Sequence, residues 1–208
     1  MPTVPVERRL VTDSRAASSE RALAHFEALF TFETDCSAMT EARLTAAEGA
    51  PVCAQQRGFL VRAARADDLD TIVELCVAHA AYEHVRLTVD GLRDRLNTAL
   101  FGDPPRVWCL VAEIDGDVEG YATFTRDYST WRATEYLHVD CLYVSPRQRG
   151  RGIGRTLMES IARQGATVGI EHLEWQTPAW NRSAVAFYER IGATGLAKVR
   201  FVWSPAEM

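Results

Sequence analysis

The spacing of apolar residues divides most of the chain into alternating strands and helices. Alternating apolar positions or short apolar runs predict strands at 59–63, 107–114, 118–125, 136–144, 172–177 and 197–203. Apolar residues that recur every three or four positions predict helices at 89–100, 152–164 and 183–191, and another that follows Asp67 or Asp68 and runs to Tyr82. An Asp-Gly-Asp turn at 115–117 joins two strands as a hairpin. This order of elements predicts an α/β (α+β) fold.

The first 58 residues show a different pattern. One helix is predicted at 19–30, with Leu23 and Phe26 on its apolar side. Residues 37–51 are rich in Ala, Thr and Glu and include few large apolar residues. We therefore divide the chain into an N-terminal helical extension, 1–58, and a domain at 59–208. The extension could cover the core, mediate association or stay partly mobile, and the sequence favours none of these roles.

The composition fits a soluble globular protein. Its 208 residues, 47% of them hydrophobic, can bury one sizeable core, and the net charge of −5 argues against non-specific nucleic-acid binding. Five cysteines without a Cys-x-x-Cys pair indicate neither a disulfide framework nor a zinc site. We therefore expect no metal and a reducing, cytoplasmic location. No apolar run approaches the roughly 18 residues of a membrane span, so no membrane association is expected.

A loop that alternates arginine with glycine separates one predicted strand from the next helix. Its arginines and glycines are Arg149, Gly150, Arg151, Gly152, Gly154 and Arg155. Because glycine has no Cβ, several backbone N–H groups can converge on one anion at the start of the helix, and the arginines can add charge-assisted contacts. A dinucleotide fingerprint would need glycine where Arg155 or Leu157 stands, and no Gly-Lys-Ser/Thr of a P-loop follows. The loop is therefore predicted to hold a phosphate group.

Two segments, in this order, resemble the GNAT superfamily of acyl-CoA-dependent N-acetyltransferases. Residues 149–154 are similar to its Arg/Gln-x-x-Gly-x-Gly/Ala motif, and residues 180–193 to its Asn-x-x-Ala-x-x-Phe-Tyr-x-x-x-Gly-Ala element. The resemblance implies a central twisted mixed β-sheet flanked by helices, acetyl-CoA as co-substrate, and a coenzyme pyrophosphate held by the loop. The predicted coenzyme-binding residues are Leu142, Tyr143, Val144, Arg149, Gly150, Arg151, Gly152, Ile153, Gly154, Arg155, Asn181, Ser183 and Ala184. Asn181 has a simpler interpretation as a helix cap.

Acyl transfer to an amine needs a base, a donor to the developing oxyanion and an acid for the leaving thiolate. Asp140 is the predicted base, because a carboxylate within an apolar strand is costly without a partner or a function. Alternation places His138 and Leu142 on the face of Asp140 and Cys141 on the opposite face, which argues against Cys141 as a nucleophile. His138 could relay a proton or be a structurally satisfied histidine. The backbone N–H of Leu142 or Tyr143 is the predicted oxyanion donor.

Tyr188 is the predicted acid. The resemblance implies this role, because the tyrosine of the Phe-Tyr pair faces the coenzyme sulfur in many members of the superfamily. The alternative is an aromatic ring that packs on the apolar face of its helix.

Further segments within 59–203 resemble the diamine N-acetyltransferase branch. The resemblance implies that the acceptor pocket is lined by Tyr82, Glu83, Glu174, Trp175 and Gln176. Opposite charge favours a cation there, so the predicted acceptor is a small-molecule primary amine such as a diamine or diamino acid. Arg200 stands where the branch has an acid, and this favours an acceptor that also carries a carboxylate. The Tyr-Glu pair could equally be a helix end with a solvated acid.

Two other functions stay open at this point. The acceptor could be a protein amino terminus or lysine, which would need an open groove in place of an enclosed pocket. The chain could also be a non-catalytic acyl-CoA-binding module, although the presence of both Asp140 and Tyr188 argues against this. A homodimer is one assembly that the sequence leaves open.

Overall fold

The structure is a computed structural model that describes residues 52–56 and 58–203. Its strands are β1 (Val52–Gln56), β2 (Phe59–Ala63), β3 (Trp108–Ile114), β4 (Asp117–Ser129), β5 (Thr134–Val144) and β6 (Leu173–Trp175). Its helices are α2 (Leu69–Tyr82), α3 (Leu92–Phe101), α4 (Ile153–Thr167) and α5 (Arg182–Arg190), with short 3-10 helices η2 (Ala66–Asp68) and η3 (Pro146–Gln148). The chain divides into two compact units between Glu174 and Trp175.

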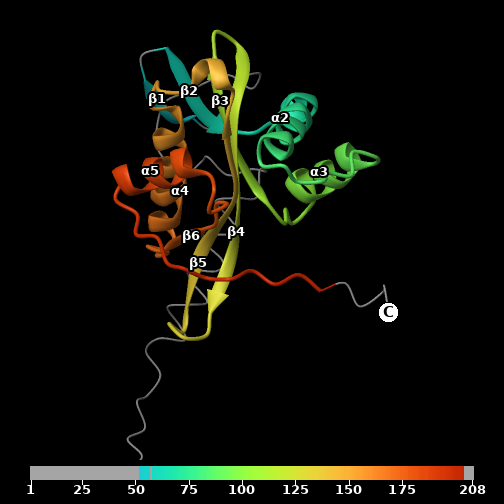
Figure 1. The fold of residues 1–208 in the computed structure, drawn as a ribbon. Coiled ribbons are helices and arrows are strands. Elements are labelled where there is room, and N and C mark those ends of the chain that lie inside the picture. Colours follow the sequence, from blue (N-terminus) through green and yellow to red (C-terminus); the bar gives the residue numbers. More distant parts are fainter. Residues whose placement is uncertain (1–51, 57, 204–208) are drawn as a thin grey trace, which may run out of the picture. The chain divides into compact units, whose positions relative to one another are not determined.

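One six-stranded sheet, in the order β1-β2-β3-β4-β5-β6, organises the fold. The first five strands form four antiparallel pairs, β1 with β2, β2 with β3, β3 with β4 and β4 with β5. The chain then leaves β5, forms α4 and returns to β6 beside β5. Figure 1 shows α2 and α3 on one side of the long central strands and α4 on the other. This mixed sheet flanked by helices confirms the predicted fold class.

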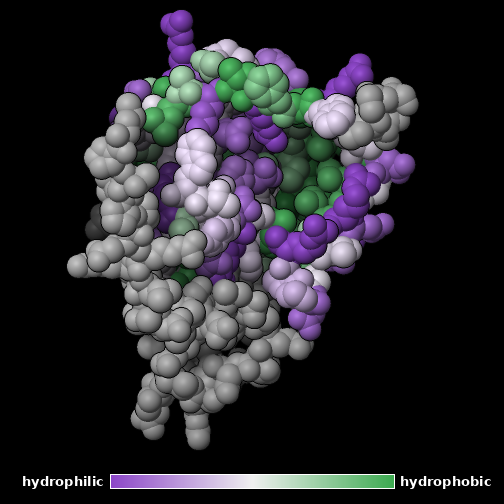
Figure 2. All heavy atoms as spheres, turned by 90° about the horizontal axis from the view of Figure 1, so that it is seen from below, coloured by the Kyte–Doolittle hydropathy of each residue, from purple (hydrophilic) through white to green (hydrophobic). Residues whose placement is uncertain are grey.

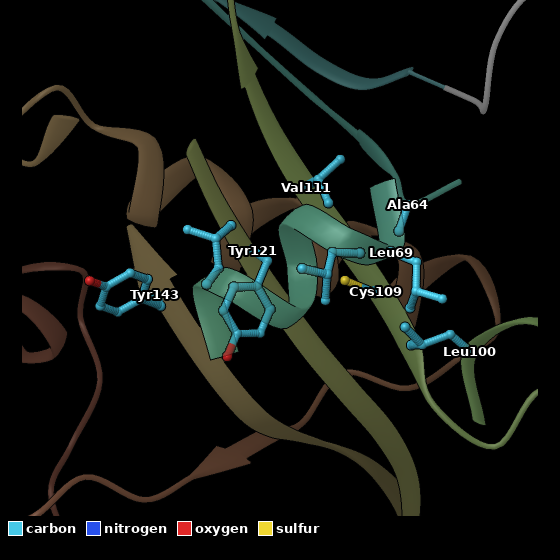
Figure 3. Close-up of a cluster of buried hydrophobic side chains, with 9 residues drawn as sticks. Ala64, Leu69, Leu100, Cys109, Val111, Tyr121 and Tyr143 are labelled. Carbon is cyan, nitrogen blue, oxygen red and sulfur yellow. The ribbon is translucent and has the colours of Figure 1, made fainter. Parts of the chain in front are cut away.

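Helix α2 covers one face of the sheet. Leu69, Ile72 and Leu75 recur every third residue and are all buried, so they form one apolar stripe. The stripe packs in a cluster with Ala64, Leu100, Cys109, Val111, Tyr121 and Tyr143. Figure 3 shows Tyr121 and Tyr143 as neighbours in this cluster, from the adjacent strands β4 and β5. Two phenol rings therefore lie on the face of the sheet that α2 covers.

Helix α4 covers the opposite face. Ile153, Leu157 and Ile161 are one helical turn apart and are almost completely buried. Near the end of the helix, a Cβ on Gly165 would lie 3.0 Å from Leu137 of β5, so glycine permits close contact with the sheet. Because helices cover both faces, β3 and β4 bury both alternating sets of their central side chains.

The start of helix α3 and the presence of strand β1 differ from the sequence-based expectation. Helix α3 begins at Leu92, not at residue 89, because Gly91 has a left-handed φ of 63° that a helix interior does not allow. Strand β1 was not predicted, and it lies in the segment assigned to the N-terminal extension. It has only five residues, Val-Cys-Ala-Gln-Gln, and too little alternation to be distinguished without its partner β2. The predicted helix at 19–30 lies outside the described residues.

The predicted final strand at 197–203 does not form. Residues 193–203 have no regular secondary structure, and apolar side chains there are exposed to solvent, with Phe201 at 89% and Trp203 at 76%. Figure 2 shows hydrophobic residues, in green, among hydrophilic ones on one face of the surface. A strand needs a partner for its backbone groups, and alternation in the sequence alone does not supply one.

Among the helices described, none has the length and apolar character of a membrane span.

Arg62 of β2 is buried between two carboxylates. Its guanidinium donates to both oxygens of Asp68, at 2.6 and 2.8 Å, and to Glu113 at 2.8 Å, and only 4% of its side chain is exposed. Burial by itself raises the pKa of Asp68, but hydrogen bonds from Arg62 and from the Arg65 N–H outweigh it, and that pKa is lowered. The pair joins the start of α2 to the sheet.

Replacing Asp68 with asparagine is expected to lower the free energy of unfolding by about 3–5 kcal/mol, because Arg62 stays buried with less compensation. Urea unfolding at pH 7 measures this loss. Asp70→Asn is the matched control, since Asp70 and Arg93 are also 2.6 Å apart but exposed, and little change is expected there. Equal losses in both variants would contradict the assignment. The folded-state pKa of Asp68 is lowered, so its contribution is complete above about pH 3.9 and disappears as pH falls further.

Candidate active site

The loop between β5 and α4 has the backbone expected for an anion site. Gly150 and Gly152 have φ values of 77° and 86°, and Gly152 is the N-cap of α4. These left-handed values favour glycine. A Cβ built on either residue would meet no atom of the described chain within 4 Å, so open space lies in front of both. The first N–H groups of α4, from Ile153 onward, have no helical acceptor and can bind an anion that enters this space.

Arg149 connects this loop to the end of α2. Its guanidinium lies over two aromatic rings, 4.7 Å from the centre of Tyr82 and 5.4 Å from the centre of Tyr143. Its Nε donates a hydrogen bond of 3.0 Å to the carbonyl of Val144. The predicted anion loop and the predicted acceptor residue Tyr82 are therefore neighbours in space.

The other two arginines that were predicted to contact the phosphate, Arg151 in the loop and Arg155 in the first turn of α4, have protein partners. Arg151 donates to the side chain of Gln148 and, at 3.3 Å, to the carbonyl of Gly58. Arg155 forms an exposed ion pair with Glu159, one turn later in α4, at 2.7 Å. Their contacts with a bound phosphate stay a prediction. The backbone N–H groups of the first turn of α4 need no change of partner to bind an anion.

Asp140 is the extra residue of a β-bulge in β5. Thr123 of β4 pairs with Cys141, whereas the next residue, Phe124, pairs with Val139, so Asp140 is skipped in the ladder. A bulge interrupts the alternation of side chains between the two faces. The thiol of Cys141 accordingly lies 3.7 Å from Oδ2 of Asp140. The prediction that Cys141 points to the opposite face from Asp140 is wrong, because it assumed an uninterrupted strand.

The bulge also changes the position of Leu142. Leu142 pairs with Ala122, whereas Tyr143 pairs with Tyr121 on the α2 face. Leu142 therefore does not share the face of Asp140, as regular alternation had predicted. His138, two residues before the bulge, pairs with Thr125 of β4. Its part in a proton relay stays a prediction.

Cys141 is still a poor nucleophile, for a different reason. Burial, with a further contribution from the charge of Asp140, raises the pKa of the Cys141 thiol to about 12. The reactive form of cysteine is the thiolate, which is scarce at neutral pH when the pKa is this high. Burial therefore argues against Cys141 as a nucleophile, as was also predicted from the sequence on other grounds.

Three polar side chains form what we call the polar wall: His79 and Glu83 at the C-terminal end of α2, and Asp140 of the bulge, whose charge acts on His79. His79 lies between Tyr121, whose oxygen is 3.3 Å from Nδ1, and Glu83, whose Oε1 is 3.5 Å from Nε2. Its ring stacks on Tyr143 with centroids 5.3 Å apart. Burial lowers the pKa of His79, while the charges of Glu83 and Asp140 oppose that change. Both carboxylates therefore act on the same imidazole. Sequence reasoning did not select His79, although its spacing of four residues from Glu83 places both on one helix face.

Glu174, a predicted acceptor residue, is already paired within its own unit. Its Oε1 accepts a 2.7 Å hydrogen bond from Arg132, in the turn between β4 and β5, and lies 3.4 Å from Nε2 of His172. An arginine at this distance offsets the charge of the carboxylate. Glu83 is therefore the better candidate to attract a cation.

The second unit, which begins at Trp175, contains the predicted general acid, Tyr188, and the predicted helix cap, Asn181. Asn181 is the N-cap of α5, and its Oδ1 accepts hydrogen bonds from the Ala184 N–H at 3.2 Å and from the Ser183 hydroxyl at 3.0 Å. On the same helix, the ring of Tyr188 lies 5.1 Å from the ring of Trp175. Gln176 follows Trp175, directly after β6. The roles of these residues in binding and catalysis stay predictions.

A model of the acetyltransferase (GNAT) family matches residues 72–193, which is more than half of the chain. The chain belongs to this family. It is 31% identical over 147 residues to thialysine N-epsilon-acetyltransferase of Bos taurus, a match that covers 67% of this chain and 86% of that protein. It is 29% identical over 92 residues to L-ornithine N5-acetyltransferase NATA1 of Arabidopsis thaliana, with coverage of 44% and 40%.

Solved structures agree with the GNAT fold. An aminoglycoside N-acetyltransferase, AAC(6')-Iy, in complex with CoA has a TM-score of 0.61 and 18% identity, and the match covers 71% of this chain and 95% of that one. At this identity the likeness shows the fold. These matches confirm the predicted GNAT family and the predicted enzyme class. This GNAT protein is an acyltransferase.

Proposed function

We propose that this GNAT enzyme transfers the acetyl group of acetyl-CoA to a primary amine of a small molecule, a diamine or a diamino acid. One observation carries the proposal: the carboxylate of Glu83 lies 3.5 Å from His79 at the end of α2, where Arg149 from the glycine loop lies 4.7 Å from the ring centre of Tyr82. The charge of Asp140 acts on the same histidine. Two carboxylates on one wall can hold an ammonium group close to the place where the thioester would end. The thioester itself is supplied by acetyl-CoA.

Deprotonation of the acceptor is the first demand on the protein. An alkylammonium of pKa about 10.4 is only about 0.04% neutral at pH 7, so the free-energy cost of forming the neutral amine is about 5 kcal/mol. Asp140 is free of a cross-strand partner in the bulge, and its carboxylate can take the proton directly or through a water molecule. Release of this proton leaves a lone pair on nitrogen for attack at the carbonyl carbon.

The remaining steps move charge from nitrogen to sulfur. As the new N–C bond forms and the C–S bond breaks, negative charge develops on the carbonyl oxygen and then on the sulfur. A backbone N–H at Leu142 or Tyr143 would donate to the oxygen. The phenol of Tyr188 would give its proton to the departing thiolate, and the second proton that the nitrogen loses as the amide forms would restore the phenol, directly or through water. Products are an N-acetylated amine and free coenzyme A.

The names of the relatives support a particular class of acceptor. Thialysine and ornithine are diamino acids, so each offers an ammonium group to carboxylates and carries a carboxylate of its own. Arg200 is an exposed cation in the second unit, and a carboxylate on the acceptor would suit it better than a long polyamine would. We therefore place diamino acids and short diamines ahead of polyamines as acceptors.

Replacing Glu83 with glutamine is expected to raise the KM for the amine by about 10- to 100-fold, because a charge-assisted contact of about 1.5–3 kcal/mol is lost. The KM for acetyl-CoA should stay within about twofold. Release of free coenzyme A, measured with ornithine, short diamines, spermine, aminoglycosides and peptides, gives both constants and the preferred acceptor.

Glu74→Gln is the matched control for Glu83→Gln. It removes the same charge from the same helix, at an exposed position away from the wall. Equal effects of the two substitutions on the amine KM would show that only the net charge matters. Turnover of peptides alone, with no small amine accepted, would overturn the proposed function.

A further inference from the structure

His79 is a polar side chain in an otherwise apolar contact between α2 and the sheet. Only 14% of its side chain is exposed, and its ring lies against the rings of Tyr121 and Tyr143. Burying an imidazole is costly unless both nitrogens have partners. Both have them, since Nδ1 faces the hydroxyl of Tyr121 and Nε2 faces the carboxylate of Glu83.

The chemistry of the two partners determines the tautomer of His79. An ionised carboxylate can only accept hydrogen bonds, so Nε2 must carry the proton that points to Glu83. In the neutral ring, Nδ1 is then an acceptor, and the Tyr121 hydroxyl donates to it. Burial raises the pKa of Tyr121, so this phenol keeps its proton. A chain of polar contacts therefore runs from Tyr121, 3.3 Å from Nδ1, through His79 to Glu83, 3.5 Å from Nε2.

We propose that neutral His79 is a positioning residue that orients the carboxylate of Glu83 toward the acceptor ammonium, and that protonation of His79 weakens acceptor binding. This rests on the proposed function, in which Glu83 holds the amine. The ring stack on Tyr143 and the bond to Tyr121 fix the imidazole, and the imidazole in turn fixes one oxygen of Glu83. The other oxygen is left for the substrate.

Protonation of His79 changes the charge of this wall. An imidazolium beside Glu83 offsets the charge that attracts the ammonium and repels the ammonium itself. The charged and titratable groups that contact His79 or act on its charge are Glu83 from α2, Tyr121 from β4, Asp140 and Tyr143 from β5, and Arg149 from the loop. Burial is the largest influence and lowers the pKa of His79 from its ordinary value of about 6.5. The transition therefore lies on the acid side of that value.

The test uses the full chain with acetyl-CoA and either ornithine or 1,3-diaminopropane, between pH 5 and pH 8. His79→Leu is expected to raise the amine KM about tenfold and to leave the acetyl-CoA KM within about twofold. His79→Gln keeps a donor toward Glu83, so its amine KM should return to within about threefold of wild type. Because glutamine does not titrate, the acid-side fall in kcat/KM should disappear in His79→Gln. His172→Gln removes another histidine that lies beside a glutamate, and it should keep the wild-type profile.

An acid-side fall that persists unchanged in His79→Gln would overturn the proposal, as would equal changes in both KM values for His79→Leu. The tautomer gives a readout that does not depend on turnover. Nitrogen NMR of the imidazole in the free enzyme should show the proton on Nε2, and Glu83→Gln should lower the pKa of His79. A proton on Nδ1 would overturn the inference whatever the acceptor is. Wild-type enzyme that acetylates neither amine but has the Nε2–H tautomer would instead count against the proposed acceptor class and against His79 as its positioning residue.

Discussion

Asp140→Asn is expected to lower kcat by about 10²- to 10⁴-fold, while the dissociation constant of acetyl-CoA stays within a few-fold. The substitution removes the proposed base at nearly constant volume. Asp140 is exposed and is the extra residue of the bulge, so its side chain contributes little to the packing of β5. Initial rates at saturating acetyl-CoA and isothermal calorimetry with coenzyme A measure the two quantities.

The pH profile distinguishes a lost base from a general loss of activity. At high pH the acceptor deprotonates itself, so the Asp140→Asn variant should recover part of its rate as pH rises. Tyr188→Phe provides the contrast, because loss of an acid is not compensated by alkaline solution. Similar pH profiles for the two variants would contradict the assignment of base and acid. Near-normal kcat in Asp140→Asn at pH 7 would show that another group takes the proton.

Gly152→Ala is expected to weaken acetyl-CoA binding by about 10- to 100-fold with a much smaller effect on the amine KM. A Cβ at Gly152 would occupy the open space in front of the loop, and it would strain a backbone with φ of 86°. Loss of one charge-assisted contact to a pyrophosphate costs about 1.5–3 kcal/mol, which corresponds to this range. Calorimetry with coenzyme A measures the change.

Gly116→Ala separates backbone strain from loss of the anion site. Gly116 has φ of 92° in the turn between β3 and β4, and a Cβ there also meets no described atom within 4 Å. Both variants should lose some thermal stability, because alanine is strained at positive φ. Only Gly152→Ala should lose affinity for the coenzyme. Comparable losses of affinity in both would mean that the loop does not bind the pyrophosphate.

Local patterns were sufficient for the helices and for the backbone conformation of the glycine loop. The buried stripes of α2 and α4 recur with helical spacing, and Gly152 and its neighbours act through their own backbone. Such features depend on residues that are close in sequence, and they were predicted nearly within their observed bounds.

Features that depend on distant partners were missed. The bulge at Asp140 exists only in relation to β4, because an extra residue is defined by the strand it faces. His79 depends on Tyr121, which is 42 positions away. Its spacing of four residues from Glu83 was visible in the sequence, but its contact with a distant phenol was not. The pairing of Glu174 with Arg132 was missed for the same reason.

The bulge at Asp140 has an evolutionary consequence. A side chain without a cross-strand neighbour can be exchanged for a longer acid, an amide or a hydroxyl without disturbing the packing of either face. Deletion of the same residue would remove the bulge and make Val139 and Cys141 consecutive, and these two already pair with the consecutive residues Phe124 and Thr123 of β4. Tyr143 would keep its pairing with Tyr121 and its place in the aromatic cluster under α2. Strand β5 can therefore change the identity of this one side chain, or lose it, while the rest of the strand keeps its register.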